Sequence, residues 1–216
     1  MIDLASQQPF AQGGNRLCFI HPEKPNRCLK VLLPNRAAEL KAKAPWYKRW
    51  RSSESFDDNA RELQGYGQRA LLHAKEDVWQ HLARCYGEVK TNLGLAVETD
   101  LILLNGGIAP TLDAYLREKG LTVEIKKAIK DLESWLLKYQ VLTKNILPHN
   151  LVIKESNGQK KLVIIDGLGS SAYIPLPSIS RFFADKYIRR RIAKMHVRIQ
   201  WEADGRKVEW EEAEKA

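Results

Sequence analysis

Two short apolar segments decide the fold: LTKNILPHNLVI, residues 142–153, and LVIIDGLG, residues 162–169. The polar tetrapeptide SNGQ, residues 156–159, separates them and predicts a turn, so the two segments are expected to form a β-hairpin. Asn150 precedes the first strand, and Asp166 follows the second. Because a hairpin returns the chain to its starting point, we expect these two side chains to lie close together. An amide and a carboxylate provide the hard oxygen ligands that Mg²⁺ prefers.

The composition limits the class of protein. At 216 residues and 44% hydrophobic content, the chain suits one domain or two small lobes with a sizeable core. No apolar run approaches the roughly 18 residues needed to span a bilayer, and the N-terminus shows no secretory signal. The cysteines, Cys18, Cys28 and Cys85, lack metal-ligand spacing and are expected to be reduced packing residues. The formal charge of +9 favours polyanionic partners such as nucleotide, nucleic acid or an anionic membrane surface.

The first part of the chain predicts mainly β structure. Residues 16–22 and 26–33 are β-leaning runs joined by a turn, and Gly13 and Gly14 precede them. A helix is expected over residues 57–72, although Gly65 and Gly67 weaken it. Two further β-leaning runs flank the turn TNLG at residues 91–94.

The rest of the chain predicts helices around the hairpin. A short helix over residues 111–119 ends at Gly120. Apolar residues then recur every three or four positions, as on one buried helix face, at Ile125, Ile129, Leu132, Leu136 and Tyr139. A last helix repeats the pattern at Ile188, Ile192, Met195 and Ile199. The prediction is an α+β fold with a β-rich lobe over residues 1–98 and a mainly helical lobe over residues 99–216.

This order of elements resembles the protein-kinase fold, and the whole chain is most similar to the PhoP regulatory network protein (YrbL) family. The likeness rests on QQPFAQGGNRLCFIHPEKPNRCLKV at residues 7–31, on AREL, on the PHNLVI hairpin and on DGLG. It implies a minimal bilobal protein-kinase-like fold, with one helix in the β-rich lobe and a reduced helical lobe. It also implies that ATP and Mg²⁺ bind in the cleft between the lobes.

The resemblance implies roles for residues of the first lobe. Protein kinases place a glycine-rich turn over the nucleotide phosphates, which implies that role for Gly13 and Gly14. CLKV resembles the kinase lysine strand, so Lys30 is the implied contact of the α- and β-phosphates. Glu62 of AREL matches the helix glutamate that pairs with that lysine. The implied hinge, whose backbone would meet the adenine, comprises Val97, Glu98 and Thr99.

The catalytic-loop likeness includes one departure. TKNILPHN resembles the kinase motif H-R-D-x-x-x-x-N, which implies a metal-binding role for Asn150, and DGLG resembles D-F-G, which implies the same for Asp166. The catalytic aspartate of kinases is replaced by Asn145. An amide can orient a hydroxyl but cannot accept its proton. Because phosphoryl transfer depends largely on positioning and charge neutralisation, both a phosphotransferase and a pseudokinase regulator stay open.

Two basic segments offer a third class, a module that binds nucleic acid or a membrane surface. The insertion over residues 34–58 interleaves aromatic and basic side chains: Trp46, Tyr47, Trp50, Lys41, Lys43, Lys48, Arg49 and Arg51. Its aromatic residues are expected either to pack on the first lobe or to contact such a partner. The last helix carries Arg189, Arg190, Arg191 and Lys194, either as a solvated face or as a contact for an acidic partner or lipid headgroups.

Residues 170–216 are all that follow the DGLG turn, where protein kinases carry a long activation segment and further helices. This difference favours a small-molecule or glycolipid acceptor, or no acceptor, over a protein substrate. The family resemblance further implies a bacterial cytoplasmic protein, peripheral to the inner membrane in one interpretation, that acts under envelope-stress control.

Overall fold

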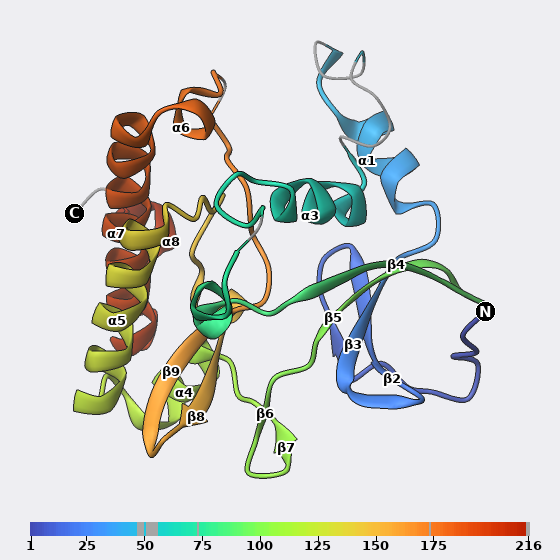
Figure 1. Cartoon of the computed structure of the whole chain (residues 1–216), viewed down its shortest axis with the longest axis horizontal. Coiled ribbons are helices and arrows are strands. Elements are labelled where there is room, and N and C mark those ends of the chain that lie inside the picture. The colour runs from blue at the N-terminus through green and yellow to red at the C-terminus, as the bar shows by residue number, and fades with distance from the viewer. Residues whose placement is uncertain (47–49, 51–55, 73, 173, 215–216) are drawn as a thin grey trace. The chain divides into compact units, whose positions relative to one another are not determined.

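The computed structural model describes residues 1–46, 50, 56–72, 74–172 and 174–214, which form two compact units (Figure 1). The first unit combines Met1–Tyr66 with Arg84–Leu101, and the second combines Gly67–Ala83 with Ile102–Ala216. The units are therefore interleaved in sequence, unlike the single boundary after residue 98 that the sequence predicts. Residues 67–83 belong with the helical unit because Leu82 and Ala83 pair with Ile164 of the hairpin.

The first unit is built on a five-stranded antiparallel sheet with the strand order β1-β2-β3-β5-β4. The strands are β1 (Ala11–Gln12), β2 (Arg16–His21), β3 (Lys24–Leu32), β4 (Cys85–Thr91) and β5 (Gly94–Asp100). Among the residues that the structure describes, helices α1 (Arg36–Lys43) and α3 (Asp58–Tyr66) accompany the sheet. Helix α3 is shorter than predicted and ends directly before Gly67, a residue that disfavours continuation of a helix.

The two faces of this sheet differ in chemistry because side chains alternate along each strand. One face forms the core of the unit, with Leu4, Phe19, Leu29, Val31 and Ala96 buried together. The strand register places Cys18 and Val97 opposite Lys30, so these three residues share the other face. Lys30 and Cys18 therefore lie on the face opposite the apolar core.

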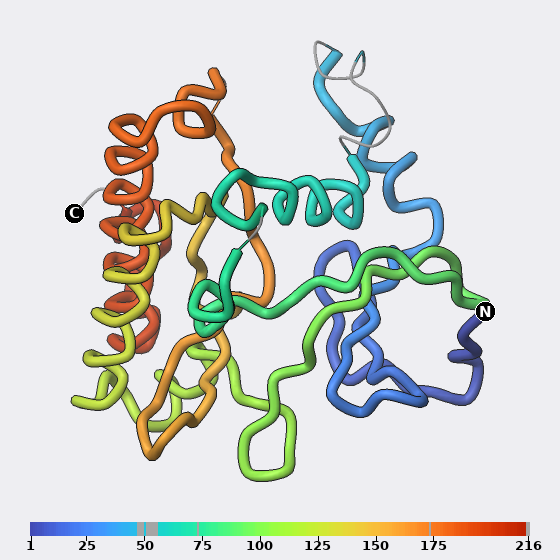
Figure 2. Tube along the Cα trace, viewed as in Figure 1, coloured from blue at the N-terminus to red at the C-terminus, as the bar shows by residue number. Residues whose placement is uncertain are grey.

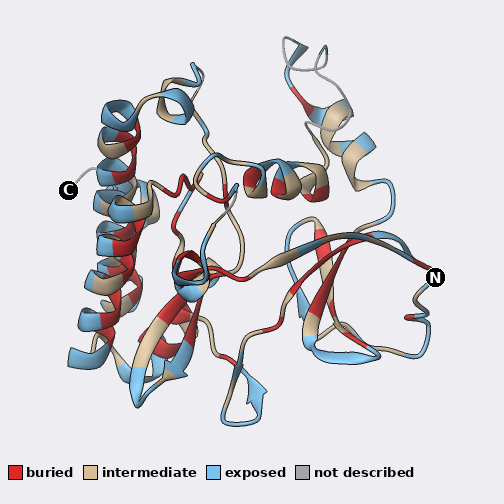
Figure 3. Cartoon of the chain, viewed as in Figure 1, coloured by how far each residue is buried: buried red, intermediate tan, exposed pale blue. Residues whose placement is uncertain are grey.

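The second unit packs helices around a small hairpin. Its helices are η2 (Glu76–His81), α4 (Leu112–Lys119), α5 (Val123–Tyr139), η3 (Pro148–Asn150), α6 (Leu176–Ile179), α7 (Arg181–Ala203) and α8 (Trp210–Ala213). Its strands are β6 (Leu103–Leu104), β7 (Gly107–Ile108), β8 (Leu151–Ser156) and β9 (Gln159–Ile164). Helices α5 and α7 lie side by side (Figure 1), and Figure 3 shows buried residues along one side of each. The predicted apolar stripes are buried at Ile125, Ile129, Leu132, Leu136, Ile188, Met195 and Ile199.

The predicted hairpin is formed by β8 and β9, and its path can be followed in Figure 2. Its turn residues Asn157 and Gly158 both have positive φ, at 52° and 70°. Two consecutive residues with positive φ match the turn whose twist suits a tight antiparallel hairpin, and Asn-Gly is the preferred sequence for it. The hairpin returns the chain to its start, because the backbone N–H of Ile165 donates to the carbonyl oxygen of Asn150 at 3.0 Å.

A buried carboxylate organises the end of α7. Glu202 is 1% exposed and accepts two hydrogen bonds from Arg206, at 2.7 and 3.1 Å. Arg198 and Arg117 lie further from the same carboxylate, at 3.6 and 3.9 Å. Transferring a carboxylate from water to the protein interior costs several kcal/mol. The three arginines offset this cost and stabilise Glu202 in its buried position. It fixes the chain direction after α7, toward α8.

The insertion after β3 is described only in part. Helix α1 lies within it, and Trp46 and Trp50 are 75% and 88% exposed, so neither packs into the core of the unit. Tyr47, Lys48, Arg49 and Arg51 lie outside the described residues. Within the described ranges, no helix is long and apolar enough to cross a membrane.

Candidate functional site

The first unit contains the ion pair that the sequence predicts. The Nζ atom of Lys30 lies 2.5 Å from Oε1 of Glu62, and the other carboxylate oxygen of Glu62 accepts a hydrogen bond from Arg16. All three residues are buried, with 5%, 4% and 8% of Lys30, Glu62 and Arg16 exposed. The carboxylate of Glu62 is thus shared between two cations, one on β3 and one on β2.

Asn59 attaches α3 to the sheet and so fixes the position of Glu62. Its Nδ2 donates to the backbone oxygens of Lys30 and Leu95, each at 3.3 Å, and its side chain is buried. Asn59 and Glu62 are three positions apart, so they lie on the same face of the helix. The role of Arg16 is not predicted from the sequence. The signal was present in the register, since Arg16 lies two positions before Cys18 on the strand face that carries Lys30.

Gly13 and Gly14 lie in the turn between β1 and β2, a pair of strands of which the sequence predicts only the second. The N–H of Gly13 donates to the carbonyl oxygen of Arg16 at 2.9 Å, and a Cβ built on Gly14 would meet nothing within 4 Å. Neither glycine has positive φ. The backbone therefore does not require glycine at these positions, and a phosphate-binding role for the turn stays a prediction.

The hinge residues expected from the sequence need a correction. Val97, Glu98 and Thr99 lie inside β5, which pairs with β3 on one side and with β4 on the other. Their backbone groups are committed to the sheet and do not offer the free N–H and C=O groups that adenine requires. The side chains of Val97 and Thr99 share the face of Lys30, whereas Glu98 is on the opposite face, paired with Lys24 and Arg27. The predicted hinge residues lie within a strand because β5 continues to Asp100.

Two thiols lie beside Lys30 on this face. A hydrogen bond with Cys28, assisted by the nearby charges of Lys30 and Arg16, lowers the pKa of Cys18 to about 7, against the opposing effect of burial. The same hydrogen bond and burial raise the pKa of Cys28. Cys18 is therefore about half thiolate near pH 7, whereas Cys28 stays protonated. The sequence analysis treated both cysteines as packing residues.

In the second unit, the catalytic-loop-like segment and the DGLG turn are tied together. The N–H of Lys144 donates to the carbonyl oxygen of Gly167 at 2.7 Å, and Gly169 donates to Leu142 at 2.9 Å. Gly167 has a φ of 86°, and a Cβ on it would lie 2.9 Å from the carbonyl oxygen of Asn145. Only glycine fits there without a shift of the loop. This contact brings Asn145 against the turn that follows Asp166.

The side chain of Asn150 lies close to this turn, next to Asp166 in the chain. The amide Nδ2 of Asn150 lies 3.5 Å from the Cβ position of Gly167, the residue next to Asp166. Oδ1 of Asp166 accepts a hydrogen bond from the N–H of Gly167 at 2.6 Å. The described residues contain no group of three or more His, Cys, Asp and Glu side chains placed to hold a metal. One amide and one carboxylate fit Mg²⁺, which binds through few protein ligands and completes its shell with phosphates and water.

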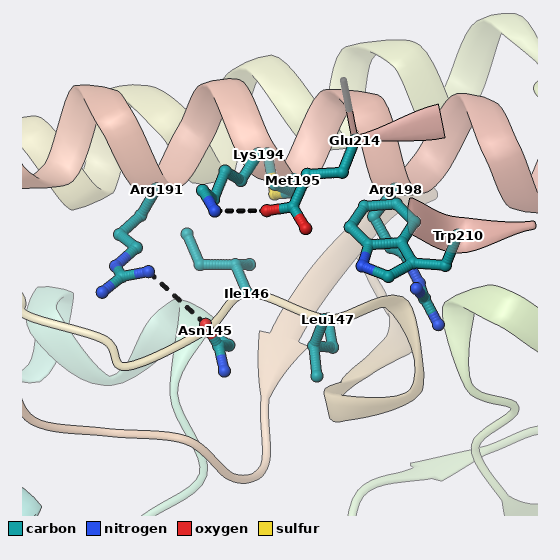
Figure 4. A pocket seen from close by; sticks show the side chains of 9 residues that line it. All are labelled: Asn145, Ile146, Leu147, Arg191, Lys194, Met195, Arg198, Trp210 and Glu214. Atoms are coloured by element: carbon teal, nitrogen blue, oxygen red, sulfur yellow. Dashed lines mark hydrogen bonds and ion pairs between the residues drawn. The ribbon is translucent and has the colours of Figure 1, made fainter. Parts of the chain in front are cut away.

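The basic residues of α7 do not form one solvated face. Arg189 pairs with Asp185 at 2.7 Å, and Lys194 pairs with Glu214. Arg190 is exposed. Arg191 instead turns toward the catalytic-loop-like segment, where its Nη1 lies 3.5 Å from Oδ1 of Asn145 (Figure 4).

Tyr187, one turn before Arg191, connects α7 to this segment. Its hydroxyl donates to the carbonyl oxygen of Thr143 at 2.9 Å and accepts from the N–H of Ser171 at 3.0 Å. Burial raises the pKa of Tyr187, but hydrogen bonds from Ser171 and Arg191 outweigh it and leave the pKa below its ordinary value. Tyr187 was missed because its hydrogen-bond partners are distant in sequence.

The arrangement of these elements is that of the protein-kinase fold. The kinase domain of Mycobacterium tuberculosis PknI superimposes with a TM-score of 0.53 at 14% identity, covering 91% of this chain and 72% of that domain. A structure of Rad53 in complex with AMP-PNP superimposes with a TM-score of 0.50 at 14% identity, covering 92% of this chain and 47% of the Rad53 chain. At these identities the likeness concerns the fold.

The family follows from the sequence match. The model of the PhoP regulatory network protein YrbL matches residues 2–200, and the chain belongs to this family. YrbL from Escherichia coli (strain K12) is 26% identical over 187 residues, covering 84% of this chain and 80% of that protein. YrbL from Shigella flexneri matches to the same extent.

The Glu62 cluster gives a stability prediction. Glu62→Gln removes the buried negative charge that faces Lys30 and Arg16, so we expect the free energy of unfolding of the first unit to fall by about 3–5 kcal/mol. Glu39→Gln is the matched control, since it removes one partner of the exposed Arg36–Glu39 pair and should cost less than about 1 kcal/mol. Urea denaturation of both variants measures the difference, and equal losses would contradict a shared buried carboxylate.

The thiol pair gives a pH prediction. Because the thiolate is the nucleophile and the pKa of Cys18 is about 7, its alkylation by iodoacetamide should rise through pH 7 and level off above it. Peptide mapping by mass spectrometry, with rates measured from pH 5.5 to about 9.5, follows each cysteine separately. Cys85, whose pKa burial raises, serves as the internal control and should react only at higher pH. If the alkylation rate of Cys18 rose with a midpoint pH as high as that of Cys85, the lowered pKa of Cys18 would be contradicted.

Proposed function

We propose that this protein binds ATP with Mg²⁺ and transfers the γ-phosphoryl group to a hydroxyl of a small molecule or glycolipid. The observation that carries the proposal is the buried Lys30–Glu62 ion pair, present in the same chain as Asn150 and Asp166. These are the charge-neutralising parts that phosphoryl transfer uses in the protein-kinase fold. The AMP-PNP complex of Rad53, a structure of the same fold, adds support for a nucleotide.

Each part has a distinct role in this proposal. Lys30 contacts the α- and β-phosphates, and Glu62 holds its ammonium group in place. The turn at Gly13 and Gly14 covers the phosphates. Asn150 and Asp166 bind Mg²⁺, which supplies neutralisation of the phosphate charge when bound. Asp166 contributes more than Asn150, because a carboxylate attracts a cation with a full charge and an amide with a dipole only.

Transfer without a catalytic aspartate relies on positioning. The acceptor oxygen forms a bond to the γ-phosphorus while the bond from that phosphorus to the bridging oxygen breaks, and ADP leaves with the bond electrons. Asn145 accepts no proton, so the hydroxyl proton passes to the transferred phosphoryl group or to water. Asn145 orients the hydroxyl through its side-chain oxygen. Since the transition state is largely dissociative, a base contributes less here than charge neutralisation does.

A small acceptor is supported by the short connection after the DGLG turn. Helix α7 begins at Arg181, so residues 170–180 contain the whole connection, and the A-P-E motif that closes a kinase activation segment does not occur in them. Tyr187 and Arg191 of α7 bind directly to Ser171, which leaves no extended segment for a peptide. The family description supports a role within the PhoP regulatory network, and we propose that the phosphorylated acceptor belongs to the envelope-stress response.

A second candidate function is a pseudokinase regulator that binds nucleotide or a partner without transfer. The observation that favours it is Asn145 at the position of the catalytic base. Loss of γ-phosphate in a single turnover, with enzyme in excess over ATP, separates the two functions. Transfer to a metabolite pool supports the phosphotransferase, and intact ATP after prolonged incubation supports the regulator.

The magnesium pair gives the test of nucleotide binding. Asp166→Asn removes the full negative charge from the metal site, so we expect ATP affinity to lose most of its Mg²⁺ dependence, by roughly tenfold or more. Asn150→Ala should cause a smaller loss, because it removes a neutral ligand. Calorimetry of ATP binding across a magnesium series measures both effects.

Glu155→Gln is the control for this series, because it also removes a carboxylate charge from the hairpin but at an exposed position away from Asn150 and Asp166. Its magnesium dependence should equal that of the unmodified protein. If Asp166→Asn behaves in the same way as Glu155→Gln, then Asn150 and Asp166 serve only to end the hairpin strands, and the proposal of Mg²⁺–ATP binding fails.

A further inference from the structure

A pocket opens beside Asn145, entirely within the second unit. Its volume is about 270 Å³. The catalytic-loop-like segment forms one wall, α7 forms another, and the segment of α8 closes it (Figure 4). The lining residues are Asn145, Ile146, Leu147, Arg191, Lys194, Met195, Arg198, Trp210 and Glu214. Because Asn145 is the residue proposed to orient the acceptor hydroxyl, this pocket lies where an acceptor would be held.

Arg191 is the least compensated charge of this pocket. Its guanidinium contacts the side-chain oxygens of Asn145 and Ser171 and lies 4.8 Å from the centre of the Tyr187 ring. These groups are all neutral, and in the described part of the chain no carboxylate forms an ion pair with Arg191. Its Nε atom is buried without a hydrogen-bond partner among the described residues. A guanidinium with unused donors is suited to bind a carboxylate or phosphate.

Two further cations line the same pocket. Lys194 pairs with Glu214, which is the single carboxylate among the lining residues. Arg198 lies 4.3 Å from the ring centres of both Trp201 and Trp210, and its Nε is 3.6 Å from Glu202. The lining therefore carries an excess of positive charge beside an aromatic wall. Glu214 already provides an anionic group in contact with the pocket's lysine.

We propose that this pocket binds the phosphate monoester of a small hydroxyl-bearing acceptor, with Arg191 and Lys194 as its contacts. The inference rests on the proposed phosphotransferase function and gives the acceptor's chemical class. The phosphate is anchored on α7, which leaves a hydroxyl of the same molecule at Asn145. Glu214 competes for Lys194, so the acceptor displaces its carboxylate. A pocket of this volume holds a molecule of sugar-phosphate size rather than a peptide.

Inorganic phosphate is the first probe, titrated into the full chain by calorimetry without nucleotide. Arg191→Gln should weaken phosphate binding at least tenfold, because it removes a charge-assisted contact. Arg190→Gln is the matched control, since Arg190 is the neighbouring arginine of the same helix, is exposed and does not line the pocket. It should leave the dissociation constant within about twofold. Glu214→Gln should tighten binding several-fold, because the internal competitor loses its charge.

Two further arms identify the source of the phosphate group. Glycerol 3-phosphate probes a soluble acceptor, and phosphatidylcholine vesicles containing phosphatidic acid probe a lipid headgroup. Binding in either arm that depends on Arg191 supports the inference, and the arm with the lower dissociation constant gives the source. Equal losses in Arg191→Gln and Arg190→Gln, or no phosphate binding at all, would overturn it. Lys194→Gln provides a second test if Arg191→Gln fails to fold.

These outcomes are independent of the nucleotide test. Asp166→Asn should bind inorganic phosphate as the unmodified protein does, because Asp166 does not line the pocket. Phosphate binding through Arg191 without any Mg²⁺–ATP binding would keep the anion pocket and reject the phosphotransferase. Mg²⁺–ATP binding without phosphate binding at Arg191 would keep the nucleotide function and reject this acceptor class.

Discussion

The buried carboxylate of Glu62 is the constraint on which the first unit depends. A charge with 4% exposure is stable only where cations replace the lost water, and here Arg16 of β2 and Lys30 of β3 do so. The carboxylate therefore joins α3 to two strands at one point. Asn59 reinforces the same junction through the backbone of Lys30. The arrangement holds the ammonium group of Lys30 in a fixed position, as a phosphate contact requires.

In the second unit, backbone contacts and a glycine hold the candidate site residues in position. Gly167 allows the DGLG turn to approach the carbonyl oxygen of Asn145, and Tyr187 holds the same segment against α7. Asn145 and Asn150 thereby lie close to Gly167, the residue that follows Asp166. The pocket lined by Arg191 and Trp210 adjoins this group of residues. The proposed metal ligands and the proposed anion pocket thus share one structural support.

The sequence predicts the structural features that depend on local patterns or on a motif of the family. The hairpin, the apolar stripes and the Lys30–Glu62 pair follow from turn chemistry, helical spacing and family resemblance. The sequence failed where contacts join distant segments. Nothing in the local sequence of Arg16 indicates a partner, and its pair with Glu62 is seen only in the folded structure. The kinase resemblance predicts a hinge at Val97, Glu98 and Thr99, but β5 continues through these residues to Asp100. Arg191 contacts Asn145 because α7 packs against the catalytic-loop-like segment. The number of basic residues in the sequence of α7 does not reveal this packing.

A crystal structure with a non-hydrolysable ATP analogue and Mg²⁺ tests the central claim most directly. The account predicts Nζ of Lys30 within hydrogen-bond distance of the α- and β-phosphates, with the Lys30–Glu62 contact retained. It also predicts oxygen atoms of Asp166 and Asn150 at about 2.0–2.1 Å from the metal ion. A nucleotide bound elsewhere, or a metal held by other side chains while Asp166 faces solvent, would contradict it.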